Sequence, residues 1–151
     1  MNHGGINNEL RDVMRFNYAG ITRANFVFEN QDRLDFPAKE RLLAEISFIR
    51  AYYYFTLTMY FGDMPLIIDR RISISEVTQL DRTPQAEVYA QIERDLDRAI
   101  EVLPWINLPV GRITKGAAMA LKGKVLLYQN KFAETAKCWK RLSPPIRQGM
   151  R

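Results

Sequence analysis

Apolar residues recur every three or four positions in five segments of the chain, and this period indicates amphipathic helices. The segments cover residues 8–31, 38–61, 83–103, 114–129 and 132–142. Polar stretches that contain proline, glycine and asparagine separate them, and these residue types interrupt helices. The pattern therefore predicts an all-α fold of antiparallel helical hairpins, with one irregular loop excursion at residues 66–83.

The segment at residues 38–61 differs from the others because apolar side chains occupy two of its sides. The first stripe is Leu42, Ile46, Ile49, Tyr53, Leu57 and Tyr60, and the second is Phe48, Tyr52, Phe55 and Met59. A narrow third stripe carries the polar tips of Ser47, Arg50, Tyr54 and Thr58. A helix that is apolar on two sides lies between other helices. We therefore expect Tyr52 and Tyr53 in the core, and Tyr54 with its hydroxyl at the surface or at a partner helix.

Turn residues mark the ends of the second and third helices. Gly62 suits the left-handed conformation that ends a helix, and Pro65 prevents the second helix from resuming. Thr83 is expected to cap the third helix, with Pro84 at its first position and a stop at Pro104. The apolar face of the third helix is predicted to be Val88, Ile92, Leu96, Ala99, Ile100 and Leu103.

The other face of the third helix alternates acids and bases, which is typical of a solvated surface. It contains Glu93, Asp97, Arg98 and Glu101. Asp95 and Asp97 are two positions apart, so their carboxylates do not face each other on a helix. We assign both carboxylates to the solvated surface.

The last two helices resemble a single tetratricopeptide unit. Small residues give the first of them a slim face at Ala117, Ala118, Ala120 and Gly123. Asn130 and Lys131 form the tight turn, and the second helix is predicted to pack back through Ala133, Ala136 and Trp139. With the paired helices before them, these two favour a tetratricopeptide-like stack.

Composition excludes several classes of protein. The chain has 151 residues, 47% hydrophobic and 26% charged, which is ordinary globular composition. The net charge of +5 is mostly dispersed among acids, so we expect no binding to nucleic acid. The one notable basic cluster is near the end of the chain, at Lys137, Lys140, Arg141, Arg147 and Arg151. The longest apolar run, at residues 51–61, is about half the length of a membrane-spanning helix. Cys138 is the single cysteine and is predicted to be a buried or half-buried free thiol.

The sequence contains no pattern of side chains that predicts catalysis. Nucleophilic catalysis needs a nucleophile with a nearby base, and the one histidine, His3, lies in the polar N-terminal segment. No spaced His, Cys and Asp set predicts a metal site, and no glycine loop has the spacing that holds a phosphate. We expect no catalytic, cofactor-binding or metal-binding residue.

Three other side chains have predicted contacts. Glu45 and Arg50 are expected to form polar contacts between helices. Trp105 lies in a loop, and we expect it to cover helix ends, with contact to a partner or a ligand as the alternatives.

Four short motifs follow one another along residues 8–138. The first is Arg23-Ala24-Asn25, and the second is the run 42–55 (LLAEISFIRAYYYF) with Phe61-Gly62-Asp63-Met64-Pro65-Leu66. The third is Val88-Tyr89 with Asp95-Leu96 and Ala99-Ile100. The fourth is the run 111–118 (GRITKGAA) followed by 124–128 (KVLLY). In this order they resemble the motifs of the SusD/RagB family of outer-membrane nutrient-binding lipoproteins.

The resemblance implies a glycan- or peptide-capturing protein on the surface of a Gram-negative bacterium. Such proteins are anchored by a lipid, sit as a lid over a TonB-dependent barrel transporter, and pass an oligosaccharide to it. They use tetratricopeptide-like helices as a scaffold and have no catalytic residues. Their sugar contacts come largely from loops and from a C-terminal part, so the resemblance assigns no ligand-binding residue here.

The chain departs from the family at both ends. It has no secretion signal and no lipid-bearing N-terminal cysteine, and Cys138 lies too deep in the chain for that role. The resemblance stops after Lys137, as a truncated or frame-shifted reading would cause. We expect a partial helical domain at residues 1–142 and a disordered tail at residues 143–151.

The sequence leaves two alternative functions. One is a tetratricopeptide-type adaptor that binds a peptide. The other is an enzyme, which no set of candidate catalytic residues supports.

Overall fold

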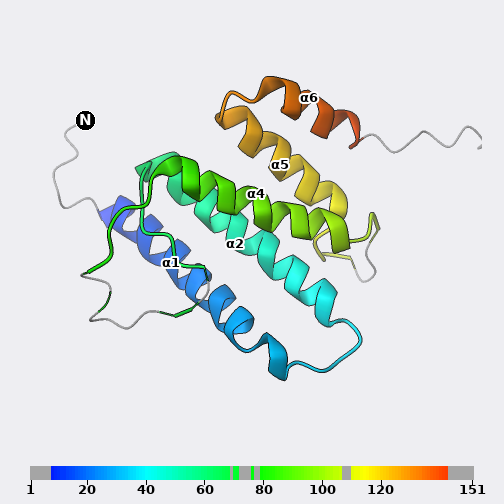
Figure 1. Cartoon of the computed structure of the whole chain (residues 1–151), viewed down its shortest axis with the longest axis horizontal. Coiled ribbons are helices and arrows are strands. Elements are labelled where there is room, and N and C mark those ends of the chain that lie inside the picture. The colour runs from blue at the N-terminus through cyan, green and yellow to red at the C-terminus, as the bar shows by residue number, and fades with distance from the viewer. Residues whose placement is uncertain (1–7, 69, 72–75, 77–78, 107–109, 143–151) are drawn as a thin grey trace, which may run out of the picture.

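The computed structural model describes residues 8–68, 70–71, 76, 79–106 and 110–142, and within them it contains helices and no strand. The helices are α1 (Asn8–Glu29), the short 3-10 helix η1 (Gln31–Arg33), α2 (Lys39–Phe61), α4 (Gln85–Val102), α5 (Lys115–Tyr128) and α6 (Phe132–Lys140). Figure 1 shows them in chain order from blue to red. The predicted all-α class is confirmed, and each α-helix begins and ends within two residues of its predicted bounds. None of the described helices is long and apolar enough to cross a membrane.

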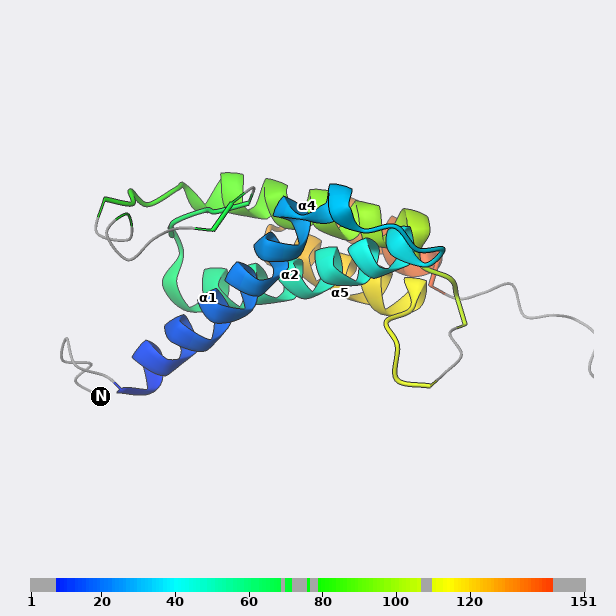
Figure 2. The same ribbon diagram turned by 90° about the horizontal axis from the view of Figure 1, so that it is seen from below.

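Helix α2 is the centre of the fold. It contacts α1, α4 and α5, while α6 packs on the outer side of α5. Figure 2 shows α1 crossing obliquely, whereas α2 and α4 run side by side. Ile21 of α1, Leu57 of α2, and Ile92 and Leu96 of α4 are fully buried between these helices. Each such side chain contributes about 1.5–3 kcal/mol on leaving water. The prediction that α2 lies between other helices is confirmed.

The prediction of which face of α2 enters the core is wrong in part. Tyr54 is completely buried, and Arg50 is 6% exposed, although both lie on the polar stripe. Tyr52 is 52% exposed, although it lies on an apolar stripe. Tyr53 is half-buried and packs against α1, where a Cβ at Gly20 would come within 2.2 Å of its ring. The reason is that α4 covers the polar stripe and supplies a charged partner for it.

The link between α2 and α4 is closed by short contacts at its two ends. Gly62 has φ +66° and ψ −117°, a conformation that suits glycine, so its predicted role as helix terminator is confirmed. Met64 and Thr83 then exchange two backbone hydrogen bonds of 3.2 and 2.9 Å. Ile67 is buried, so the excursion at residues 66–83 is not exposed throughout. The apolar residues Ile72, Ile74 and Val77 lie outside the described residues.

The start of α4 differs from the prediction. Pro84 is the capping residue and Gln85 the first helical residue, whereas Thr83 was expected to cap. Asp63 Oδ1 accepts a 2.8 Å hydrogen bond from the backbone N–H of Gln85. The carboxylate from the end of α2 therefore satisfies the free N–H group that a local cap would otherwise serve. The predicted apolar face of α4 is confirmed, with Val88 and Leu103 fully buried at its two ends.

Helices α5 and α6 form the predicted antiparallel hairpin. Asn130 adopts φ +60° in the tight turn. A Cβ at Gly123 would lie 1.8 Å from Trp139 Nε1, so the missing side chain lets the Trp139 ring approach α5. The predicted face of α6 is wrong for Ala133 and Ala136, which are exposed, because Thr135 is buried in their place. On α5, Ala118 is buried as expected, whereas Ala117 and Ala120 are exposed. The predicted tail at 143–151 lies outside the described residues.

Candidate functional site

A buried ion pair joins α2 to α4. Arg50 Nε donates to Asp95 Oδ2 at 2.8 Å, and Arg50 Nη2 donates to Asp95 Oδ1 at 2.7 Å. The two side chains are only 7% and 6% exposed. Arg50 Nη1 also donates to Asn25 Oδ1 on α1 at 3.0 Å and to the carbonyl of Ile68 at 2.6 Å. A buried guanidinium is tolerated when its geometry is bidentate and its remaining donors are satisfied, as they are here.

The same cluster holds the segment that follows α2. We call the backbone of Pro65–Ile68 with Arg70 the strap. Asn25 Nδ2 donates to the carbonyls of Ile67 and Arg70 at 2.8 and 3.3 Å. Tyr54 Oη donates to the Ile67 carbonyl at 2.7 Å and accepts from the Ile67 N–H at 2.8 Å. Side chains of the helices therefore provide the hydrogen bonds that a sheet neighbour supplies to an ordinary strand.

Two tyrosine hydroxyls act as neutral donors in this region. Burial raises the pKa of Tyr54, and it outweighs the hydrogen bond to Ile67 and the charge of Arg50, both of which lower it. Burial also raises the pKa of Tyr18, whose hydroxyl donates to the Pro65 carbonyl at 2.7 Å. Both phenols remain protonated at neutral pH and keep their hydrogen bonds to the strap.

The Arg50 guanidinium has an aromatic neighbour as well. Its carbon lies 4.3 Å from the centre of the Phe28 ring on α1. Gln91 Nε2 donates to Asp95 Oδ1 at 3.1 Å, so the carboxylate has three donors. The polar atoms of the cluster are thus occupied by one another. We assign it to joining α1, α2, α4 and the strap, rather than to holding a ligand.

A second ion pair, at the other side of α2, anchors the start of α5. Arg112 donates from Nε and Nη2 to the two carboxylate oxygens of Glu45, at 2.9 and 2.6 Å. These hydrogen bonds raise the pKa of Arg112, so its charge persists across the accessible pH range. The predicted polar contacts of Glu45 and Arg50 are confirmed, although the partner of Glu45 lies in the loop before α5.

Trp105 covers a helix end, as predicted. Its ring lies 3.6 Å from the position that a Cβ of Gly116 would take in the first turn of α5. The side chain remains 45% exposed, so the outer part of its ring faces solvent. Thr114 caps the same helix end by accepting a 3.2 Å hydrogen bond from the N–H of Ala117.

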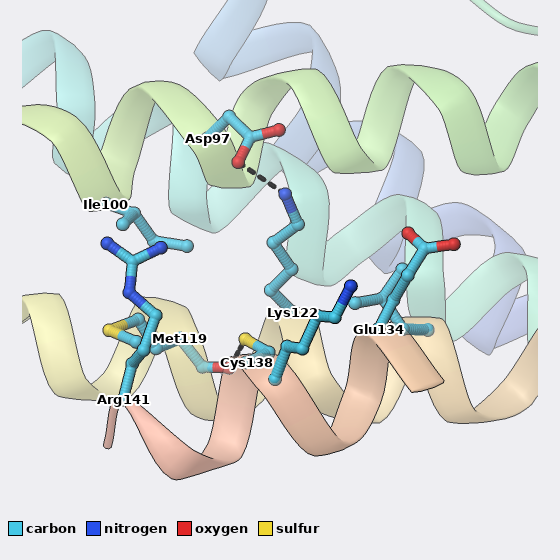
Figure 3. Close-up of a pocket in the computed structure, with 9 residues that line it drawn as sticks. Asp97, Ile100, Met119, Lys122, Glu134, Cys138 and Arg141 are labelled. Atoms are coloured by element: carbon cyan, nitrogen blue, oxygen red, sulfur yellow. Dashed lines mark hydrogen bonds and ion pairs between the residues drawn. The ribbon is translucent and has the colours of Figure 1, made fainter. Parts of the chain in front are cut away.

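A groove lies between α4 and α6, with α5 as its floor (Figure 3). Its volume is about 220 Å³. Asp97 and Ile100 line it from α4, and Met119, Lys122 and Leu126 line it from α5. Glu134, Lys137 and Cys138 line it from α6, together with Arg141, which follows that helix. We call this hollow the α4–α6 groove.

Two contacts shape the α4–α6 groove. Lys122 reaches from α5 to form an ion pair with Asp97 of α4, as the dashed line in Figure 3 shows. Cys138 Sγ donates to the Met119 carbonyl at 3.3 Å. Burial raises the pKa of the Cys138 thiol and outweighs the charges of Lys122 and Arg141, which lower it. The prediction of a half-buried free thiol is confirmed.

A shallower hollow of about 320 Å³ lies beside α1. Thr22, Arg23, Phe26 and Arg71 line it. The Arg71 guanidinium lies 4.6 Å from the centre of the Phe26 ring and pairs with Glu29 at 2.8 Å. Arg71, which follows the strap, therefore places a cation over an exposed aromatic ring of α1.

The sequence prediction for Asp95 is wrong. This carboxylate was assigned to solvent, but the residue is only 5% exposed. Asp95 lies three positions after Ile92 and four before Ala99, so helical spacing places it on the apolar face. That spacing was the available signal. The role of Asn25 was not predicted, and its only signal was its place in the Arg23-Ala24-Asn25 motif.

The expected absence of catalytic, cofactor-binding and metal-binding residues remains a prediction. His3 lies outside the described residues. Among the residues that the structure describes, no group of three or more His, Cys, Asp or Glu side chains is placed to hold a metal ion. The ligand-binding residues, which the sequence left unassigned, are not identified by the buried clusters.

Comparison with known proteins connects the chain to one group. The family model described as SusD-like, starch-binding and associating with the outer membrane matches residues 8–127. SusD-like protein P2 from Formosa agariphila is 30% identical over 116 residues, which are 77% of this chain and 22% of that protein. The chain spans about a quarter of the length of the curated relatives it matches.

Solved structures agree with the fold. A laminarin-binding SusD-like protein superposes with a TM-score of 0.81 and 36% identity, over 87% of this chain and 29% of that one. A SusD-like protein from Bacteroides fragilis gives a TM-score of 0.81 and 31% identity, over 88% of this chain and 26% of that one. The helical arrangement is therefore that of this group of proteins.

Proposed function

The chain belongs to the SusD-like family of starch-binding proteins that associate with the outer membrane, and on that basis we propose that its protein captures an oligosaccharide and delivers it to a TonB-dependent transporter. The family match over residues 8–127 carries the proposal. The laminarin-binding SusD-like protein among its structural relatives supports a polysaccharide fragment as the ligand class. In this reading the protein binds the glycan without cleaving it.

We assign the role of scaffold to the helices described here. The motifs that resemble the family contain the side chains of the buried contacts. Asn25 lies in the first motif, Arg50 and Tyr54 in the second, Asp95 in the third and Arg112 in the fourth. The family signature thus coincides with the contacts that hold the helices and the strap in one arrangement. A rigid scaffold of this kind positions binding loops with little loss of conformational entropy on binding.

The proposed location is the cell surface, in a lipoprotein anchored to the outer membrane. The association of the family with that membrane supports it. The proposed partner is a TonB-dependent barrel transporter, which would take up the captured oligosaccharide. The alternative is a tetratricopeptide-type adaptor for a peptide, which the antiparallel hairpins alone would equally suit.

Calorimetric titration of the complete protein with neutral laminari- and malto-oligosaccharides tests the binding proposal. We expect binding in at least one series and no new reducing ends after prolonged incubation. Release of reducing ends would show an enzyme and overturn the proposal. If no oligosaccharide binds and a defined peptide does, the protein is a peptide-binding adaptor instead. Copurification of the complete protein with the transporter encoded by a neighbouring gene tests the partner separately. Failure of the two proteins to copurify would contradict the delivery step.

A further inference from the structure

We propose that the α4–α6 groove is a subsite for an acidic sugar, one that carries a carboxylate or sulfate group. The inference rests on the proposed binding of oligosaccharide and adds the chemical class of one sugar unit. The groove is open to solvent and lies between two helices, with a third as its floor (Figure 3). It is separate from the buried ion pairs that hold the scaffold together.

The charges that face the groove favour an anion. Three cations line it, Lys122, Lys137 and Arg141, against the two acids Asp97 and Glu134, which leaves a net charge of 3 − 2 = +1. Lys122 is paired with Asp97. Lys137 and Arg141 form no ion pair with any residue that the structure describes.

The two cations without an ion pair share one face of the chain at the end of α6. Lys137 and Arg141 are four positions apart at the end of α6, a spacing that places both side chains on one face. By contrast, Arg50 and Arg112 already hold carboxylates bidentately elsewhere in the fold. The planar fork of Arg141 matches the geometry of a carboxylate or sulfate, and Lys137 adds a point charge.

The remaining lining fits the body of a sugar. The half-buried Ile100 supplies apolar surface for the C–H groups of a pyranose ring, and the buried Met119 and Leu126 lie beneath it. Glu134 supplies an acceptor for sugar hydroxyls. Figure 3 shows Arg141 and Glu134 at opposite ends of the groove, so the acidic group belongs at the Arg141 end and hydroxyls at the Glu134 end.

The size of the groove limits the ligand. Its volume of about 220 Å³ is below the range of roughly 300–1,000 Å³ that is usual for ligand pockets. One sugar unit therefore enters it, while the rest of an oligosaccharide lies outside. An acidic peptide is the less favoured occupant because the chain belongs to a family described as starch-binding.

Cys138 offers a built-in reporter for this groove. It lines the groove, and it is the only cysteine of the chain. Alkylation of the 151-residue chain by iodoacetamide therefore reports on one position. We would measure its rate with tetragalacturonate, with the methyl ester of tetragalacturonate, and with sulfated neocarratetraose, at matched ionic strength. The ester has the same sugar but no charge.

We expect tetragalacturonate or the sulfated sugar to slow alkylation severalfold at saturation, and the ester to have no effect. The sugar that protects Cys138 from alkylation shows whether the groove prefers a carboxylate or a sulfate group. Equal protection by the ester and the acid would overturn the proposal, as would protection by an acidic hexapeptide alone. Equal protection by sodium sulfate would also overturn it, because the groove would then recognise a free anion rather than a sugar.

Single variants distinguish a site from general attraction between charges. Lys137→Gln and Arg141→Gln should each raise the ligand concentration for half-protection about tenfold, as expected when one charge-assisted hydrogen bond is lost. Lys140→Gln is the matched control, because Lys140 lies on the same helix, is exposed, and does not line the groove. It should change that concentration less than about twofold.

An equal effect of the three substitutions would contradict the proposal. Circular dichroism of each variant checks that the helices remain folded. The neutral oligosaccharide titrations keep the two proposals apart. If they succeed while the acidic sugars leave Cys138 unprotected, the subsite fails and the proposed function stands. If no carbohydrate binds in either experiment, both fail.

Discussion

Two faces of α2 differ in burial in the opposite sense to their polarity. The face with polar tips, Arg50 and Tyr54 among them, is buried against α4, α1 and the strap. Tyr52 and Tyr60, one from each apolar stripe, lie instead on an exposed face of the helix, and their side chains are 52% and 59% exposed. Hydropathy alone would place these faces the other way round. The difference teaches that burial in this helix depends on where partners for its polar groups lie.

The buried charges of the polar face are stable because they are paired with each other, although the buried Thr58 hydroxyl on the same stripe makes no hydrogen bond. Removing a guanidinium and a carboxylate from water costs several kcal/mol for each ion. The bidentate contact of Arg50 with Asp95 offsets that cost, together with the further bonds to Asn25 and Ile68. No comparable demand exists on the aromatic face, since a tyrosine ring with its hydroxyl in water leaves no polar group unsatisfied.

The largest expected effect comes from breaking the buried ion pair. Asp95→Ala leaves the Arg50 guanidinium buried without its carboxylate, which should lower the free energy of unfolding by about 3–5 kcal/mol. Urea unfolding followed by circular dichroism measures it. Asp97→Ala is the control, because the Asp97 side chain is 60% exposed in its pair with Lys122. It should cost about 1 kcal/mol or less. Equal costs for the two substitutions would contradict the comparison of faces.

Tyr54→Phe should have the next largest effect. The substitution keeps the ring but removes the hydroxyl that serves both the N–H and the carbonyl of Ile67. The Ile67 carbonyl keeps its bond from Asn25, but leaving the buried Ile67 N–H unsatisfied should cost about 1–3 kcal/mol in unfolding free energy. Tyr52→Phe, on the exposed face, should change it by no more than about 0.5 kcal/mol. A Tyr54→Phe variant as stable as the wild type would show that the strap does not depend on this hydroxyl.

Alkaline pH provides a second test of Tyr54. Because its pKa is raised in the folded protein, its contribution to stability is complete below the unfolded tyrosine pKa of about 10. It is lost as the pH rises from there through the folded pKa. The stability of Tyr54→Phe should therefore fall less steeply above pH 10 than that of the wild type. Identical slopes would argue against a buried neutral phenol.

The smallest effect is expected on the exposed face. Tyr52→Ser and Tyr60→Ser should each lower the unfolding free energy by less than about 1 kcal/mol, because the rings are already half in water and have only edge or tilted contacts with one neighbour. Thermal unfolding of the two variants and of the wild-type chain measures this difference. A loss above about 2 kcal/mol would mean that this face is covered in solution, and would remove the contrast between the two faces.

The helices were predictable because their signals are local. The stop at Gly62 and Pro65, the apolar period of α4, and the turn at Asn130 all depend on residues within a few positions of one another. Where a signal was read against the wrong neighbour, the prediction failed. Ala133 and Ala136 suit a close helix contact, but the face of α6 that packs on α5 carries Thr135 and, four positions later, Trp139. Trp139 approaches α5 at Gly123, and Thr135 is buried.

The candidate site was less predictable than the helices. Trp105, Glu45 and Arg50 were singled out from the sequence, and each makes the kind of contact expected of it. The α4–α6 groove was not predicted, since it is formed by side chains of three helices that no local pattern relates. Lys137 and Arg141 form its basic side, but in the sequence they are only part of a charged helix end.

The sequence by itself determined the all-α class, the helix ends and, through its four ordered motifs, the family. Only the tertiary structure decided which face of α2 is buried. Arg50 has Asp95 as partner 45 positions further on, and Asn25 as partner 25 positions before it. Helical periodicity describes one segment at a time, whereas the stability of a buried charge depends on partners that folding brings from elsewhere in the chain.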